Sequence, residues 1–443
     1  MVSTYDLTRG PIKAQLVALA VPLLAGNILQ KLYNAVDAVV VGKIVGDTAF
    51  AAVGVAGSVM NLFLFLISGG CTGVSVLLAQ LYGAGEEEDF RKDFFLASVF
   101  GAILSLALSG LAFLVIDPLL KILQTPDDIF VPTLDYLYVI FLGFLPAFAF
   151  HLSSGVLRAV GNTKAALSFL SVSMIVNMAL DILFVAGLNM GVAGAAWATV
   201  TAQLLAAVCS LIYLKVKFPQ MIFGRADMVY DGPLLRRTAH FGFVSSLHMC
   251  SLYIGKLLVQ GTVNSLGTDA ITAFTAAIRI EAFANSFGDS GCTAMSVFVG
   301  QNTGAGSKKR VKEGFRQGQW LLVALSIFMS LIMILGARPL LALVLPAGSE
   351  GCYPAAAGYL RLVAVFYFLN FIGSGQVGYF EGRGLVNLPV IGATGHIAFR
   401  VIAFWLLADV MGLPGLALAT GLGWLGAVSF WYLRWRRDQR DLE

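Results

Sequence analysis

The sequence predicts an all-α polytopic membrane protein with twelve transmembrane helices, arranged as two pseudo-symmetric bundles of six. Two observations support this fold class. The first is composition: hydrophobic residues make up 58% of the 443 residues and charged residues 12%, and the mean hydropathy is +0.83. These values lie well outside the range of soluble domains. The second is an internal repeat with a period of half the chain.

Apolar stretches recur along the whole chain, and most of them exceed the roughly 18–20 residues that cross a bilayer. The connections between them are short and leave no room for a domain outside the membrane. We predict twelve spans, at about 14–43, 50–82, 90–116, 127–158, 164–188, 192–217, 233–265, 269–302, 314–345, 349–381, 386–411 and 413–435.

The repeat is visible in short polar and small-residue motifs. Each motif of the first half returns 221 positions later without a gap. The first set is Gly70-Cys71-Thr72, Ser75-Val76, Gln80, Gly83-Ala84-Gly85, Gly191, Gly194, Ala198 and Thr199, and the second is Gly291-Cys292-Thr293, Ser296-Val297, Gln301, Gly304-Ala305-Gly306, Gly412, Gly415, Ala419 and Thr420.

Each repeat holds an even number of spans, so both should insert with the same orientation. The halves would then be related by a pseudo-two-fold axis along the membrane normal, with a cavity between them. We expect an N-lobe over residues 1–223, a cytoplasmic linker over 224–232, where Pro and Gly accompany polar residues, and a C-lobe over 233–443.

The basic residues predict the orientation. Of the 29 Lys and Arg residues, 21 fall on one side of the predicted spans, three on the other and five within spans. An excess of basic residues marks the cytoplasmic side. We therefore expect a multi-pass plasma (inner) membrane protein with both termini in the cytoplasm. The net charge of +4 then reflects topology and not nucleic-acid binding.

Charged side chains within spans are the strongest functional signal. A carboxylate at mid-bilayer costs about 2.5–3.5 kcal/mol on insertion scales, so such a group suggests a pathway or an ion site. Asp37 lies deep in the first span, and Asp181 lies in the fifth. Polar residues at helical spacing share the helix faces of both acids. Gln30, Tyr33 and Asn34 lie on the face of Asp37, and Asn177 lies on the face of Asp181. Span six adds Thr199 and, one turn further on, Gln203.

If the two carboxylates converge in a medium of low dielectric, one must hold a proton or a cation must lie between them. Asp37, Asn177, Asp181 and Thr199 would supply hard oxygen ligands, which suit a small cation or protons and not zinc or copper. We predict coupling to H⁺ or Na⁺ at these four residues. The alternative is a structural hydrogen-bond network that holds spans one, five and six together.

The second half carries charges of both signs within its spans. Its cluster comprises Lys256, Glu281, Asp289 and Arg400. Internal ion pairs, such as Lys256 or Arg400 with Asp289, are one interpretation. A cluster that faces the substrate or responds to protons is another, and the sequence does not choose between them.

Enzyme chemistry is not indicated. The chain has no HExxH, GxSxG, Walker or dinucleotide-binding motif in a suitable context. We expect no enzymatic activity, no cofactor and no firm metal site. Without a nucleotide site, any active transport would draw on an ion gradient.

The chain resembles the multidrug and toxic compound extrusion (MATE) family over its whole length. The resemblance rests on twelve spans in two repeats, the turns Gln80 to Gly85 and Gln301 to Gly306, and the run from Gly155 to Lys164 after span four. Gly191 to Ala196, which opens span six, is also similar. The resemblance implies a V-shaped, two-lobed exporter that alternates between outward-facing and inward-facing states.

In its N-lobe the chain is most similar to the DinF branch of that family. The resemblance implies that Asp37, Asn177, Asp181 and Thr199 form the sodium or proton site, and that Pro22 is the kinking proline of span one. Loading of Asp37 would then bend the span at Pro22, where a backbone carbonyl lacks its helical donor. Gln30, Tyr33, Asn34, Ser154 and Gln203 are the candidate residues of the substrate cavity.

The chain also departs from the family pattern. Two acidic residues of the NorM branch align with Leu252 and Asn370, and an asparagine of span four aligns with Ser154. Arg400 occupies about the position in the second repeat that Asn177 holds in the first. The absence of the two acids argues against a cation site of the NorM type in the C-lobe. The serine indicates that the substrate shell is not preserved in full, and Arg400 indicates that the lobes have diverged.

The sequence as a whole predicts a monomeric secondary antiporter that exports amphipathic, cationic organic compounds in exchange for H⁺ or Na⁺. Abundant Phe and Met suit an adaptable apolar cavity, and acidic residues favour cations. The alternative is a flippase for a lipid-linked oligosaccharide from the same superfamily, which the span count opposes. A passive channel would need rings of polar residues along a pore, and the sequence shows none.

Overall fold

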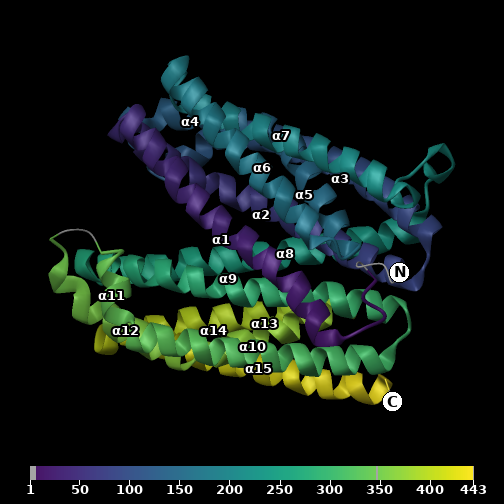
Figure 1. The fold of residues 1–443 in the computed structure, drawn as a ribbon. Helices are drawn as coiled ribbons and strands as arrows, with labels where there is room; N and C mark the ends of the chain where they lie inside the picture. The colour runs from purple at the N-terminus through teal and green to yellow at the C-terminus, as the bar shows by residue number, and fades with distance from the viewer. Residues whose placement is uncertain (1–5, 346–347, 443) are drawn as a thin grey trace. The chain divides into compact units, whose positions relative to one another are not determined.

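A computed structural model describes residues 6–345 and 348–442, apart from the side chains of 34–41, 43–44, 47, 350, 409 and 441–442. Its regular structure consists of helices (Figure 1). The chain forms two compact units. Unit 1 contains Ala25–Ser246, and unit 2 contains Leu7–Leu24 together with the chain from Leu247 onward.

Unit 1 is built around six long elements. They are most of α1 (Ile12–Ile44), α2 (Asp47–Ala84), α3 (Glu87–Ile122), the pair α4 (Asp127–Leu142) and α5 (Phe144–Ala159), α6 (Thr163–Asp181) continued by the π-helix η1 (Ile182–Gly187), and α7 (Gly191–Lys217). The short 3₁₀ turns η2 (Pro219–Met221) and η3 (Arg225–Asp227) lead to the first half of α8 (Gly232–Asn264).

Unit 2 repeats this plan. After the second half of α8 come α9 (Thr268–Gly304), α10 (Lys308–Leu335), the short α11 (Ala337–Ala342), η4 (Glu350–Cys352), the pair α12 (Tyr353–Val365) and α13 (Tyr367–Gly382), α14 (Asn387–Met411) and α15 (Leu413–Leu442).

The described helices agree with the predicted spans. Within the part of the chain that the structure describes, nine helices are long and apolar enough to cross a membrane. Counting α4 with α5 and α12 with α13 as single bent spans raises the number to eleven. The predicted eighth span corresponds to α9, which has 37 residues. Charged residues along it, among them Arg279, Glu281 and Asp289, together with many small polar residues, lower its apolarity. The protein is therefore an all-α, multi-pass membrane protein.

The two repeats share their helix pairings as well as their motifs. In unit 1, α2 packs on α5, α6 on α7 and α4 on α7, and in unit 2 the equivalent pairs α9 with α13, α14 with α15 and α12 with α15 also pack together. The fourth span of each repeat is broken at the same place, by 50° between α4 and α5 and by 51° between α12 and α13.

The Gly-Ala-Gly turns of the repeat are confirmed as helix ends. Gly85 has φ 74° and closes α2, and Gly306 has φ 65° just after α9. A residue with a side chain is strained at such a positive φ. The repeated motif therefore encodes a repeated turn.

The two units differ in one respect from the lobes that the sequence predicts. The boundary falls inside helices: α1 passes from unit 2 to unit 1 after Leu24, and α8 passes from unit 1 to unit 2 after Ser246. These switches lie 222 positions apart, within one residue of the repeat offset. Residues 7–24, expected in the N-lobe, and 233–246, expected in the C-lobe, are thus exchanged.

Close backbone packing holds the first half of α8 in unit 1. A Cβ atom on Gly73 of α2 would lie 2.1 Å from the Phe241 carbonyl oxygen, so only glycine permits this approach. Ser246 donates a hydrogen bond to the Leu66 carbonyl at 2.7 Å. Thr238 donates to the carboxylate of Asp93, which is fully buried in α3. These contacts explain why the boundary does not follow the linker.

Apolar burial holds residues 7–24 in unit 2. Leu7, Ile12, Leu16 and Leu19 are buried in one cluster with side chains of α9, α10, α13 and α15. Between helices in a membrane, close van der Waals packing of such side chains is what favours association. This cluster therefore fixes the start of α1 to unit 2.

Candidate ion and substrate site

Three helices of unit 1 join their polar side chains around Asn177. Tyr33 of α1 donates a hydrogen bond to the Asn177 side-chain oxygen. Asn177 of α6 donates from Nδ2 to the Thr199 hydroxyl at 3.3 Å, and Thr199 of α7 donates to the Ala195 carbonyl at 3.1 Å. The predicted spans one, five and six therefore meet through three of the residues named from the sequence.

Local structure explains how α6 presents these groups. Asn162 caps the helix by accepting a hydrogen bond from the Ala165 amide at 3.1 Å, which satisfies an otherwise free donor at the helix start. At the other end the α-helix stops at Asp181, and Ile182–Gly187 continue as a π-helix. A π-helical turn is rare and is frequent at functional sites.

Asp181 is the acidic group of this site. It lies one turn beyond Asn177 on α6 and is 1% exposed, while Asn177 is 3% exposed. A buried carboxylate needs hydrogen bonds, a cation or a proton to offset its desolvation. The burial of Asp181 therefore agrees with the predicted ion site, although the alternative of a structural network has the same geometry.

The other proposed acid, Asp37, lies outside the described side chains, as does Asn34. Their backbone belongs to α1, one turn or less from Tyr33. On the far side of Pro22, α1 packs on α6 where a Cβ atom on Gly26 would lie 3.2 Å from Leu170. The convergence of Asp37 with Asp181 stays a prediction.

The remaining cavity candidates are less closely linked. Gln30 and Gln203 are half-buried in α1 and α7. Ser154 of α5 is buried and accepts a hydrogen bond from Arg158 Nη1 at 2.9 Å. This pair was not predicted from the sequence, although its spacing of one helical turn could have suggested it.

In unit 2 the charge cluster is organised by Glu281. Tyr367, the first residue of α13, donates to Glu281 Oε2 at 3.3 Å. The charges of Arg400 and Lys256 both act on this carboxylate. Glu281 is 8% exposed. The ion pairs predicted with Asp289 stay predictions.

Tyrosines are the members of this cluster that sequence reasoning missed. Tyr367 and Tyr359 are both fully buried. In the sequence they cannot be distinguished from the other aromatic residues of an apolar span. The hydroxyl of Tyr367 joins Glu281 at the break between α12 and α13. Only the presence of a bend at that point, which the sequence did not reveal, would have singled out this tyrosine.

Asn370, where the NorM branch has an acid, has an uncharged partner. Its Nδ2 donates to Asn285 Oδ1 at 2.7 Å, which joins α13 to α9. An amide pair replaces charge at this position. The absence of a cation site of the NorM type stays a prediction.

The repeated bundles, the broken fourth spans and the polar junction in unit 1 define a multi-pass membrane transporter. A sequence model described as MatE matches residues 22–183 and again 245–406. The chain therefore belongs to the MatE family, and the two matches correspond to its two repeats.

Known relatives align over nearly the whole chain. It is 26% identical to the probable multidrug resistance protein YpnP of Bacillus subtilis (strain 168), over 98% of this chain and 97% of that protein. It is 25% identical to the probable multidrug resistance protein NorM of Thermotoga maritima, over 86% and 82%. A solved multidrug resistance MATE family transporter of the MOP superfamily superimposes with a TM-score of 0.91 at 22% identity, covering 100% of this chain and 99% of that one.

Proposed function

We propose that this protein is a secondary active antiporter of the plasma (inner) membrane. It exports amphipathic, cationic organic compounds in exchange for H⁺ or Na⁺, as a monomer with both termini in the cytoplasm. The observation that carries the proposal is the junction of Tyr33, Asn177 and Thr199 beside the buried Asp181.

The donor set supports a proton or a small cation as the coupling ion. The carboxylate of Asp181, the amide oxygen of Asn177 and the hydroxyl of Thr199 are hard oxygen ligands. An ion at Asn177 would share Oδ1 with the Tyr33 hydroxyl, which already donates to it. Binding would therefore change the hydrogen bond that joins α1 to α6.

Pro22 gives a route from this change to the rest of α1. Proline cannot donate a backbone hydrogen bond, so the helix is weaker at that turn. Two residues later α1 passes from unit 2 into unit 1. A bend at this point, driven by the loading of Asp37 or Asp181, would let the two parts of α1 move differently.

The substrate class is supported by two features. Relatives of this chain are named multidrug resistance proteins, and acidic groups in a cavity favour organic cations. The substrate residues proposed are Gln30, Tyr33, Asn34, Ser154 and Gln203.

The test is transport by the purified protein in proteoliposomes. A fluorescent organic cation is followed while a pH gradient and a Na⁺ gradient are imposed separately. We expect uphill movement of the cation with at least one gradient, and the effective gradient identifies the coupling ion. Flux of a lipid-linked oligosaccharide without any cation transport would instead favour the flippase alternative.

A further inference from the structure

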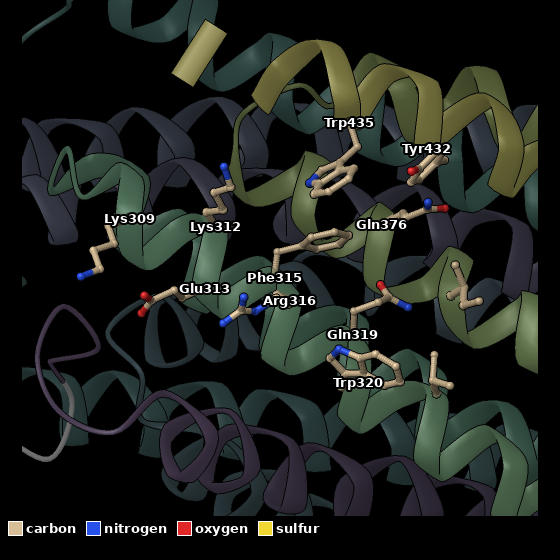
Figure 2. A pocket seen from close by; sticks show the side chains of 12 residues that line it. Lys309, Lys312, Glu313, Phe315, Arg316, Gln319, Trp320, Gln376, Tyr432 and Trp435 are labelled. Carbon is tan, nitrogen blue, oxygen red and sulfur yellow. The ribbon is translucent and has the colours of Figure 1, made fainter. Parts of the chain in front are cut away.

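Unit 2 has a cavity of 730 Å³ away from the residues of the charge cluster. It lies among α10, α13 and α15, and Figure 2 shows the side chains that line it. One end carries Lys309, Lys312 and Arg316 of α10 together with a single acid, Glu313. The remainder is mainly aromatic and aliphatic. The cavity therefore has a cationic end and an apolar body.

The lining follows one face of α10. Lys309, Lys312, Arg316, Trp320 and Val323 recur at intervals of three and four residues, which places them on one stripe. At 1.5 Å per residue the stripe is about 21 Å long. One leaflet of hydrocarbon is about 15 Å deep, with about 5–7 Å of head-group region beyond it. The cavity thus has the length of one lipid leaflet, with its basic residues at head-group depth.

Three side chains that line the cavity carry buried polar atoms without partners among the described residues. Gln376 is 3% exposed, and its Oε1 has no hydrogen-bond partner. Both polar atoms of the Gln319 side chain and Nε1 of Trp435 are also buried without a hydrogen-bond partner. Buried polar groups in native proteins are nearly always satisfied. These side chains line the cavity beside its basic end, where the Trp435 ring packs on Phe315 with ring centroids 5.4 Å apart.

The outer wall also fits a lipid better than a soluble molecule. Trp320 is 70% exposed and Tyr432 is 47% exposed. Trp and Tyr concentrate where a membrane meets water, and basic pockets between membrane helices on the cytoplasmic side bind anionic head groups. A soluble anion would use the basic end alone and leave the apolar body empty.

We propose that this cavity is a binding site for one anionic phospholipid. Lys309, Lys312 and Arg316 hold its phosphate, and an acyl chain lies along Trp320 and Val323. This lipid is neither the exported substrate nor the coupling ion, so the site is independent of the proposed transport function.

The first experiment measures lipid retention by native mass spectrometry of the detergent-purified full chain. Phosphatidylglycerol and phosphatidylcholine with the same acyl chains are added in turn. The basic-end variant Lys309→Gln, Lys312→Gln, Arg316→Gln should lose preference for phosphatidylglycerol by about fivefold for each basic residue removed. The control variant Lys215→Gln, Lys217→Gln, Arg225→Gln removes three exposed charges from unit 1 and should keep the preference.

The second experiment locates the acyl chain with brominated lipids, which quench tryptophan fluorescence. Trp320 and Trp405 are both 70% exposed, but only Trp320 lines the cavity. Brominated phosphatidylglycerol should quench more than brominated phosphatidylcholine in the wild type and in Trp405→Phe. The difference should decrease in Trp320→Phe, where Trp435 is the remaining tryptophan of the cavity lining.

Three outcomes would overturn the proposal. One is equal loss of preference in the basic-end and control variants, which would mean general attraction to the surface. Another is full competition by inorganic phosphate with no dependence on the acyl chain, which would mean a soluble anion site. The third is quenching that does not distinguish Trp320 from Trp405. Circular dichroism and size-exclusion profiles confirm that each variant is folded.

Discussion

Arg310 Nη2 donates a 2.8 Å hydrogen bond to the backbone carbonyl of Leu7. The same guanidinium donates to Gly10 O at 3.0 Å, to Asn302 Oδ1 at 3.0 Å and to Gln15 Oε1 at 2.9 Å. Arginine alone has a planar fork of donors that can serve several acceptors at once. Within unit 2, Arg310 of α10 thus fastens the segment that precedes α1.

Replacing Arg310 should release this segment. We expect Arg310→Ala to destabilise unit 2 by about 2 kcal/mol, because hydrogen bonds from a charged donor contribute about 1.5–3 kcal/mol. Hydrogen exchange provides the measurement, since the Leu7 amide donates to Gln301 Oε1 at 3.1 Å. Exchange at Leu7 should accelerate by at least about tenfold.

The control for this experiment is Lys308→Ala, which removes an exposed charge two residues away. It should leave exchange at Leu7 unchanged. Equal acceleration in both variants would show that net charge, and not the hydrogen bonds of Arg310, holds the segment.

Neutralising the buried acids should uncouple transport. Asp181→Asn and Asp37→Asn each remove the group that would hold a proton or Na⁺, so we expect ion-driven efflux to fall to background while expression is retained. Asp117→Asn is the matched control, because Asp117 is exposed in α3 and accepts a hydrogen bond from Tyr138. Efflux that persists in both variants would exclude these acids from coupling.

Much of the fold could be predicted from the sequence because a membrane imposes strong periodic constraints. Spans must be about 20 residues long and apolar, and a repeated motif implies a repeated turn. Gly85 and Gly306 illustrate this, since both adopt the positive φ that the Gly-Ala-Gly motif suggests. Asn177 and Thr199 were also predictable, because polar residues at helical spacing stand out against an apolar background.

The unit boundaries could not be predicted in the same way. They depend on close contacts between distant segments, such as Gly73 against the Phe241 carbonyl, and a single sequence does not encode which helix face meets which. Tyr367 was missed for a similar reason. Its hydroxyl matters only because α13 begins there and reaches Glu281.

The charge cluster of unit 2 makes a prediction about pairing. Lys256 and Arg400 act on Glu281, whereas the sequence suggested Asp289 as the partner of either. A double-mutant cycle of Lys256→Met with Glu281→Gln should give a coupling energy above about 0.5 kcal/mol, the usual threshold for interacting residues. For comparison, a second cycle pairs Lys256→Met with Asp289→Asn. Coupling confined to Asp289 would contradict the central place of Glu281.

The connection after α7 should loosen in acid. The Gly224 amide donates to Asp227 Oδ2 at 2.8 Å, and Arg91 Nε lies 3.0 Å from Oδ1. The Gly224 hydrogen bond first, and then Arg91, hold the pKa of Asp227 below its usual 3.8. Because the pKa of Asp227 is lower in the folded state than in the unfolded state, its ionisation stabilises the fold at pH values above the unfolded-state pKa. This stabilisation is lost as the pH falls through the folded-state pKa.

Pepsin digestion over a series of acidic pH values measures this loosening. Cleavage between Met221 and Val229 should rise as the pH falls in the wild type. In Asp227→Asn, cleavage should be high over the whole pH series, because this variant has no carboxylate to protonate at position 227. Glu86→Gln, an exposed acid without a capping hydrogen bond, should behave as the wild type does. A pH profile that is unchanged in Asp227→Asn would assign the effect to other groups.

The hydrogen bond from Tyr33 to Asn177 offers a way to identify the coupling ion. Tyr33→Phe removes the donor that competes for Asn177 Oδ1, and Thr199→Ala removes a hydroxyl ligand. If Na⁺ binds here, Tyr33→Phe should lower the Na⁺ concentration for half-maximal transport about fivefold, the equivalent of one neutral hydrogen bond of about 1 kcal/mol. Thr199→Ala should raise it. Thr199→Ser keeps the hydroxyl and should retain most of the wild-type response. If both Tyr33→Phe and Thr199→Ala leave the Na⁺ dependence unaltered while transport still follows a pH gradient, the ion at this site is a proton, since a proton needs only the carboxylate.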